Sequence, residues 1–226
     1  MSQAKERPIL FSGPMVRAIL EGRKTVTRRA VKQWQQPTPQ DDGSWFAVAQ
    51  RHPRWGFGVS GADAPACAQE LSASGCCPYG RPGDRLWVRE SWAQINVAQA
   101  PGESWVVYRE CDNRTDYGGP WKPSIHMRRR DSRILLEITD VRVERLQDIS
   151  ERQALAEGIV GVDFRPDDGF PICRGYMVGP DDGSTPLETH ASKAFAGLWR
   201  SINGPDSWDT NPWVWAVEFK RIDSCA

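Results

Sequence analysis

The sequence predicts an α+β protein that is mainly β, built as a small β-barrel with peripheral helices. The chain has 226 residues, of which 39% are hydrophobic and 11 are Trp, so it has enough apolar material for a core. Short stretches with strand character recur from Arg85 to the C-terminus, and few helical segments interrupt them. This pattern favours a barrel over a parallel α/β sheet, which needs a helix between most strands.

The N-terminal part is expected to begin with a short helix and a basic strand. Pro14 suits a first helical turn, an apolar stripe follows it, and Gly22 can adopt the left-handed conformation that ends a helix. Residues 23–29 contain β-branched side chains, so an extended segment is expected there.

Further strands are expected in the second half of the chain. The turn signal Pro82-Gly83-Asp84 precedes the first of them. The predicted strands cover residues 85–89, 105–109, 133–139, 141–146 and 213–219. In the last of these, large apolar side chains alternate with smaller or charged ones, which is the period of a strand.

Two more helices are predicted, one before and one after an acidic stretch. Ser150 and Gln153 can form a capping box at the start of the first helix, and Gly158 ends it. The second helix, at residues 191–202, has the most regular amphipathic pattern in the chain. Both helices are expected to pack beside the barrel.

The whole chain is expected to form one domain with two insertions. Residues 33–79 show no sustained period, and residues 160–188 are acidic and rich in Gly and Pro. A length of 226 residues fits one elaborated domain. We therefore expect a single domain over residues 1–226, with irregular insertions at about 33–79 and 160–188.

Several classes of protein are disfavoured. The longest apolar run, Trp213 to Val217, is far shorter than the roughly 20 residues of a membrane-spanning helix, and the N-terminus lacks a signal peptide's apolar segment. A soluble, cytoplasmic protein with no membrane partner is expected, and its six Cys are interpreted as thiols. Cys67, Cys76 and Cys77 lack a paired C-x-x-C spacing, so we expect neither a zinc site nor a cofactor.

The net charge of zero conceals two basic segments. Lys and Arg number 29, as do Asp and Glu. Residues 1–32 carry eight basic and two acidic side chains, a balance of +6, and residues 121–133 carry five and one, a balance of +4. Residues 160–190 hold six acids and two Arg, a balance of −4. Such a chain can present a positive face to phosphates at zero net charge.

Common catalytic signatures are absent from the sequence. It contains no G-x-S-x-G, no P-loop, no G-x-G-x-x-G after a strand and no H-E-x-x-H. The three His residues, His52, His126 and His190, lie far apart in the sequence, so the sequence gives little support for a His-based catalytic triad.

The densest group of polar side chains is Gly22 to Arg29, with the sequence Gly-Arg-Lys-Thr-Val-Thr-Arg-Arg. On charge alone, a solvated basic strand end explains it as well as a site does. Lys24 and Thr27 would point to opposite faces of an extended strand. They can converge only if Lys24 belongs to the turn after Gly22.

Glu157 is a further candidate for the same site. It falls in the last turn of the predicted helix, where the helix dipole disfavours a negative charge. A carboxylate in that place suits a proton donor or a partner for Lys24. The plainer alternative is an ordinary exposed Glu.

Four motifs, in the same order, resemble the ASCH family, whose domain is a PUA-like β-barrel. They are G-R-K-T-x-T-R-R at Gly22–Arg29, P-G-D-x-L-x-V at Pro82–Val88, S-E-x-x-A-x-x-E-G-I at Ser150–Ile159 and W-V-W-x-V-E-F at Trp213–Phe219. They run through the whole fold and leave the two insertions unmatched. The larger, Trp-rich form resembles ASCH proteins of bacteriophages and prophages.

The resemblance implies a nucleic-acid-related function, with an amidohydrolase first among the choices. Some family members remove the acetyl group from the exocyclic amine of acetylated cytidine, and their catalytic Lys, Thr and Glu correspond to Lys24, Thr27 and Glu157. Neighbouring Arg residues should lower the pKa of Lys24, so that it can take the proton of Thr27. Thr27 would attack the acyl carbon and Glu157 would protonate the departing amine. Arg28 stands where those enzymes have an apolar residue.

Two alternatives use the same region. One is an RNA or modified-DNA binding module without turnover, and the other is a ribonuclease acting in the same cleft. The side chains expected to hold phosphates are Arg23, Arg28, Arg29, Arg128, Arg129 and Arg130. Trp87, Trp92 or Trp121 could stack an unpaired base, although Trp87 lies on a predicted strand and can equally belong to the core. The expected partner is therefore a modified nucleoside, RNA or modified DNA, and the sequence leaves the oligomeric state open.

Overall fold

A computed structural model gives the fold of residues 4–52, 54–96, 104–111, 120–166, 171–180 and 182–222. Its strands are β1 (Glu6–Leu10), β2 (Val26–Ala30), β3 (Thr38–Pro39), β4 (Trp45–Arg51), β5 (Gly56–Gly61), β6 (Arg85–Arg89), β7 (Trp92–Asn96), β8 (Ser104–Tyr108), β9 (Leu135–Arg145), β10 (Ile159–Phe164), β11 (Cys173–Val178) and β12 (Trp213–Ile222). Its α-helices are α1 (Gly13–Leu20), α2 (Ala64–Ala73), α3 (Glu151–Ala156) and α4 (Ala191–Asn203). Short 3-10 helices are η1 (Gln33–Gln35), η2 (Ser124–His126), η3 (Arg129–Asp131), η4 (Leu146–Asp148) and η5 (Pro205–Ser207).

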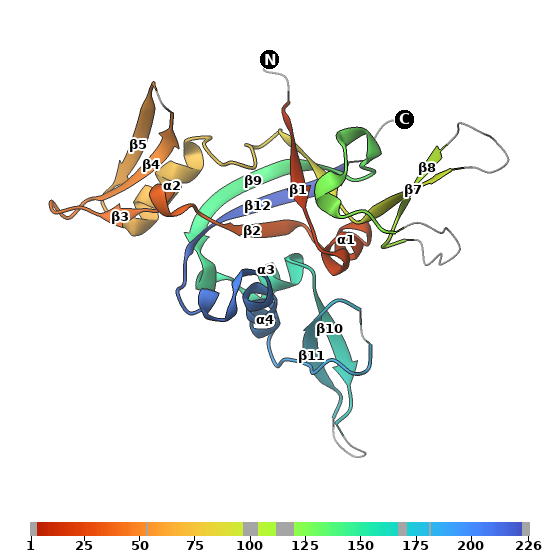
Figure 1. The fold of residues 1–226 in the computed structure, drawn as a ribbon. Helices are drawn as coiled ribbons and strands as arrows, with labels where there is room; N and C mark the ends of the chain where they lie inside the picture. The colour runs from red at the N-terminus through yellow and green to blue at the C-terminus, as the bar shows by residue number, and fades with distance from the viewer. Residues whose placement is uncertain are drawn as a thin grey trace.

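A curved five-stranded sheet forms the centre of the molecule (Figure 1). Its strand order is β1-β6-β9-β12-β2. The pair β1 and β6 is parallel, and the other neighbours are antiparallel. The fold is thus α+β and mainly β, as predicted. In the part of the chain that the structure describes, no ladder of hydrogen bonds joins the outer strands β1 and β2, so the sheet is open there.

Helix α1 and most of the predicted strands are confirmed with one correction, and strand β1 of the central sheet was not predicted. Helix α1 and strands β2, β6, β8 and β12 lie where the sequence placed them. The two strands predicted at 133–139 and 141–146 are a single strand, β9, that runs through Asp140. The register with β12 shifts at this level, because Glu218 pairs with Asp140 and Phe219 with Ile138, which leaves Thr139 of β9 as the extra residue. Strand β9 therefore carries a β-bulge rather than a break between two strands.

The insertion at 33–79 is not irregular, and this prediction was wrong. It contains the three-stranded sheet β3-β4-β5 and the helix α2. Strand β5 contains three glycines, at 56, 58 and 61, which weaken the alternating pattern. The ring of Phe46 lies where a side chain at Gly58 would be, which explains a small residue there. Helix α2 is rich in Ala and carries only a weak apolar stripe.

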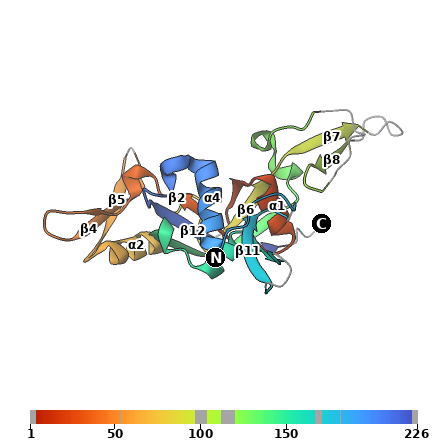
Figure 2. The same ribbon diagram turned by 90° about the horizontal axis from the view of Figure 1, so that it is seen from below.

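The insertion at 160–188 also contains regular structure. Strands β10 and β11 form an antiparallel hairpin, in which Ile159 pairs with Val178 and Phe164 with Cys173. Residues 167–170 and 181 of this insertion lie outside the described residues. A second hairpin, β7 and β8, extends from the side of the molecule opposite to the β3-β4-β5 sheet (Figures 1 and 2).

Two hydrophobic clusters hold these parts together. The larger one joins α1 and the central sheet to the insertion at 33–79, and it includes Ile19, Trp215 and Val217 together with Cys67 and Leu71 of α2. The smaller one joins α3 and α4 to the end of the sheet. As Figure 1 shows, α3 and α4 lie together below the β2 end of the sheet. None of the helices in the described part of the chain has the length and apolar character that a membrane crossing requires.

Candidate active site

The turn after α1 brings Lys24 toward the start of β2. Gly22 has a φ of 75°, which an L side chain adopts at a cost, and it ends the helix as predicted. The backbone N–H groups of Arg23 and Lys24 both donate to the carbonyl of Ala18, at 2.8 and 3.0 Å. Lys24 therefore belongs to the turn rather than to the strand, which is the condition under which it can converge with other motif residues.

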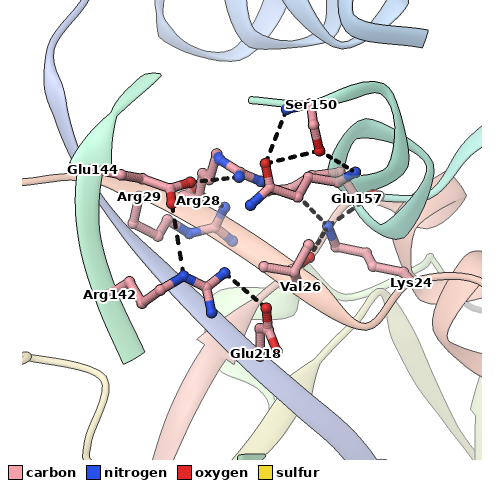
Figure 3. Close-up of polar contacts among 10 residues, drawn as sticks. Lys24, Val26, Arg28, Arg29, Arg142, Glu144, Ser150, Glu157 and Glu218 are labelled. Carbon is pink, nitrogen blue, oxygen red and sulfur yellow. Dashed lines mark hydrogen bonds and ion pairs between the residues drawn. The ribbon is translucent and has the colours of Figure 1, made fainter. Parts of the chain in front are cut away.

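The ammonium group of Lys24 is buried and fully hydrogen-bonded. Its Nζ donates to the carbonyl oxygens of Val26 and Glu157, both at 2.8 Å, and to Glu157 Oε2 at 2.6 Å. Lys24 Nζ also lies 5.5 Å from the centre of the Phe11 ring. Figure 3 shows Lys24 reaching Glu157 from the turn that precedes β2. The two residues are 133 positions apart in the sequence, so the fold alone brings them together.

Glu157 is the C-terminal cap of α3. The helix begins with the predicted capping box between Ser150 and Gln153, and Gly158 follows Glu157 with a φ of 102°. A Cβ at Gly158 would lie 3.1 Å from Ala18 Cβ and 3.5 Å from Lys24 Cβ, so only glycine lets α3 approach the turn this closely. Glu157 is buried, and the alternative of an ordinary exposed Glu is excluded.

Arg28 binds Glu157 from a second direction. Its Nη1 is 3.2 Å from Glu157 Oε1, and its Nη2 is 2.5 Å from Glu144 Oε1 (Figure 3). The Arg28 side chain has no solvent exposure. This placement argues against Arg28 as a phosphate contact, because both ends of its guanidinium already bind carboxylates. The buried network thus alternates in charge along Lys24, Glu157, Arg28 and Glu144.

Thr27 precedes Arg28 on β2, but among the described residues no hydrogen bond joins its side chain to this network. It pairs with Val217 in the sheet and is completely buried. Among the residues that the structure describes, its Oγ1 has no hydrogen-bond partner, and Lys24 directs all three of its donated bonds elsewhere. Most buried hydroxyl groups in proteins are paired, so an unpaired one at a candidate site is notable.

A pocket of about 400 Å³ opens onto the network between β2 and α4. This volume is in the range of small-molecule sites, which is about 300–1,000 Å³. Its polar wall includes Arg28, Arg29 and Glu157, and its apolar wall includes Phe195 and Trp199 of α4. Lys24 and Thr27 are not among the residues that line this pocket.

The pKa of Lys24 is lowered from its ordinary value. Burial is the main cause, because it disfavours the ammonium form. The carboxylate of Glu157 acts in the opposite direction, and the nearby charges of Arg29 and Arg28 lower the pKa further. The sequence therefore predicted the right direction, but it assigned the effect to the Arg neighbours, which are the smaller cause.

The other Arg residues of the motif bind backbone and surface groups. Arg23 donates to the carbonyl of Gly158 at 3.2 Å and pairs with Glu21. Arg29 Nη2 donates to the carbonyl of Leu10 at 2.9 Å and its guanidinium lies over the Phe11 ring. Arg29 thus connects the outer strand β2 with the end of the other outer strand, β1.

The second basic segment lies on the surface, at η3. The side chains of Arg128 and Arg130 are 62% and 73% exposed, with Asp131 carboxylate oxygens 3.9 and 3.8 Å away. Arg129 differs, because it binds Glu6 at 2.5 Å.

The Trp residues proposed for base stacking are mostly unsuitable. Trp87 and Trp92 are buried and cannot stack a base from solution, and Trp121 is only half-buried.

The sequence missed several residues that build the site. Glu144 has no motif of its own, although the alternation Val-Arg-Val-Glu in β9 indicates a polar face opposite an apolar one. Phe11 was not predicted at all, and the apolar side of α4 was predicted only as one face of an amphipathic helix. Glu144 also lies on the wall of a larger groove, of about 1050 Å³, between α2 and β9, whereas Glu157 does not. The network therefore extends from one pocket to the other.

Comparison with known proteins gives no match. The chain matches no family model, and neither curated proteins nor solved structures include a significant match. The function must therefore be argued from the motifs and from the geometry of the site.

Proposed function

We propose that the chain is an ASCH-type protein with a PUA-like barrel, and that it removes an acyl group from the exocyclic amine of a modified cytidine or a related nucleobase. One observation carries this proposal: the buried pair of Lys24 and Glu157, with Nζ and Oε2 at 2.6 Å, beside a pocket whose wall includes Glu157. The curved sheet supports the barrel, since Arg29 already connects the two outer strands.

The chemistry requires a proton to move along the buried residues. Neutral Lys24 accepts the proton of the Thr27 hydroxyl while Thr27 Oγ1 attacks the acyl carbon. Lys24 passes that proton to Glu157 Oε2, and Glu157 delivers it to the amine as the C–N bond breaks. Water then hydrolyses the acyl ester on Thr27. The lowered pKa of Lys24 suits the first step, because less free energy is needed to deprotonate its ammonium group to the neutral amine.

The pocket supports a nucleobase-sized substrate. Its volume of about 400 Å³ accommodates a small ring system, and its apolar wall, which includes Phe195 and Trp199, suits the apolar part of such a ring. Thr27 does not line the pocket, so for the reaction we expect Glu157 and Arg28 to shift when substrate binds and to let the acyl group reach Thr27. The unpaired Thr27 hydroxyl is then the group that gains a partner.

The test is hydrolysis of acetylated cytidine by the purified protein, followed as release of cytidine. The wild type should release cytidine, and Lys24→Ala should lose this activity because no base remains for Thr27. Lys220→Ala, which removes a surface ammonium paired with Glu137 at 2.9 Å, is the matched control and should retain it. Circular dichroism establishes whether Lys24→Ala is folded. A wild type that hydrolyses no acylated nucleoside would refute the proposal.

A second candidate, binding of nucleic acid without turnover, is favoured by the exposure of Arg128 and Arg130. Both guanidinium groups are available to phosphates, and their contacts to Asp131 are long. Binding of short RNA that weakens in Arg128→Gln/Arg130→Gln, in a protein that hydrolyses nothing, would favour this candidate over the first.

A further inference from the structure

A separate basic and aromatic surface lies at the end of the β4–β5 hairpin. We call it the hairpin tip and define it by Arg51, His52, Arg54 and Trp55, together with Lys32 and Trp34 beside them. The hairpin projects from the central sheet on the side opposite β7 and β8 (Figure 1). It belongs to the insertion that the ASCH motifs leave unmatched.

Trp55 of the tip and the nearby Phe57 are open to solvent, and Trp34 is half-buried. Trp55 is 55% exposed, and its ring centre lies 5.1 Å from that of His52, with an angle of 31° between the planes. Phe57, two residues further along β5, is 44% exposed. Neighbouring exposed aromatic side chains are costly to keep in water and mark binding surfaces.

The cations at the tip have no carboxylate partner within the described part of the chain. Lys32 Nζ and Arg51 Cζ each lie 6.0 Å from the ring centre of Trp34. Among the described residues, no Asp or Glu forms an ion pair with Lys32, Arg51 or Arg54. Residues 22–40 and 43–62 contain no acidic residue at all. The surface is therefore positive without internal compensation, unlike the buried network.

The tip is built on a firm scaffold. Gln35 Nε2 donates to the carbonyl of Ala49 at 2.9 Å, which fixes η1 and Trp34 against β4. Arg51 pairs with Gly56, where a Cβ would lie 2.8 Å from the carbonyl oxygen of Gln50. Strands β4 and β5 thus remain paired up to the tip, and the rings and cations are held near one another before any ligand binds.

We propose that the hairpin tip binds single-stranded nucleic acid. Unpaired bases stack on Trp55 and Trp34, and Lys32, Arg51 and Arg54 contact the phosphates. A single strand offers both features together, whereas a duplex hides the faces of its bases. The inference goes beyond the proposed hydrolysis and does not depend on it, because binding at the tip needs none of the buried residues.

The first measurement is fluorescence anisotropy of a fluorescein-labelled oligouridine with the full-length protein at low salt. Trp55→Ala should weaken binding about tenfold, which corresponds to the loss of one base stack. The matched control is Trp105→Ala on β8, since Trp105 is 59% exposed and far from the tip. Equal losses in the two variants, or no binding by the wild type, would overturn the proposal.

The second measurement is the salt dependence of the same binding. Each phosphate contact with a single strand contributes about −0.7 to the slope of log K against log salt, so three contacts give about −2. Arg51→Gln/Arg54→Gln should make the slope shallower by about 1.4. Arg152→Gln/Lys193→Gln, which removes two exposed cations on α3 and α4, should leave it unchanged. A slope near zero in the wild type would exclude phosphate contacts.

Two further arms of the experiment test alternatives. The first asks whether the tip binds a membrane surface, and the second asks whether nucleic acid binds at η3 instead of at the tip. Vesicles containing phosphatidylserine that bind through Trp55, with no binding of oligouridine, would assign the tip to a membrane surface and overturn the inference. A loss confined to Arg128→Gln/Arg130→Gln would place nucleic-acid binding at η3 and overturn it as well. Trp55→Ala should retain whatever hydrolysis of acetylated cytidine the wild type has, so failure of the hydrolase proposal leaves this test intact.

Discussion

Thr27 is the residue whose role is most sharply testable. Its buried hydroxyl has no hydrogen-bond partner, so its removal leaves no other polar group unpaired. Thr27→Val should therefore leave the free energy of unfolding unchanged or raise it by up to about 1–3 kcal/mol. If Thr27 is the nucleophile, the same change should lower the rate of cytidine release by more than about 10³-fold. Urea unfolding and the hydrolysis assay measure the two effects.

Thr25 provides the matched control for this experiment. It lies two residues earlier with an exposed side chain, and its backbone N–H donates to the carbonyl of Ala156. Thr25→Val should change neither stability nor rate appreciably. Full activity in Thr27→Val would remove Thr27 from the mechanism, and loss of activity in Thr25→Val alone would assign the nucleophile to the other hydroxyl of the motif.

Arg29 tunes the protonation of Lys24. Lys24 must be neutral to accept a proton, and its pKa is lowered below the ordinary 10.5, first by burial and further by the charges of Arg29 and Arg28. The rate of hydrolysis should thus rise with pH at pH values below 10.5. Arg29→Gln removes one positive neighbour, so the ammonium form of Lys24 becomes more stable and its pKa rises. The curve of rate against pH therefore moves to higher pH. Profiles of kcat against pH check this.

The control for the pH profile is a cation that does not act on Lys24. Lys220→Gln removes a surface charge that pairs with Glu137, and its profile should match that of the wild type. A curve for Arg29→Gln that moves to lower pH, or stays in place, would show that Lys24 is not the titrating base.

Strands β2 and β9 lie on either side of β12 and are connected by the ion pair between Arg28 and Glu144. Ala216 of β12 faces Arg28 on one side and Arg142 on the other, and its small side chain lets the Arg28 guanidinium reach Glu144 at 2.5 Å. Glu144→Gln weakens this contact and leaves Arg28 with Glu157 as its remaining carboxylate partner. We expect the free energy of unfolding to fall by about 1–3 kcal/mol.

Glu137 is the matched control for Glu144. It lies on the same strand and pairs with Lys220 at the surface. Glu137→Gln should cost less than about 1 kcal/mol, because exposed ion pairs contribute little. Equal costs for the two variants in urea unfolding would mean that the buried network adds nothing to the stability of the sheet.

At the scale of the whole molecule, the sequence predicted the parts that have local signals. Gly22 and the capping box at Ser150 marked where two helices end or begin, and the motif residues Lys24 and Glu157 do converge. Glu144 could not be found, because its partner is 116 residues away and only the strand register brings them together. The β3-β4-β5 sheet escaped notice because its glycines interrupt the period on which strand prediction depends.

The insertion at 33–79 shares its hydrophobic core with the central sheet. Leu71 of α2 is fully buried in the same cluster as Ile19 and Trp215 of the central part. If the chain folds as one domain, Leu71→Ala should lower its stability by about 2–5 kcal/mol, and Trp fluorescence and circular dichroism should report one shared urea transition. Leu155→Ala, at a position 38% exposed, should stay within about 0.5 kcal/mol of the wild type. Two separate transitions, with only one moved by Leu71→Ala, would show instead that the insertion unfolds independently of the central sheet.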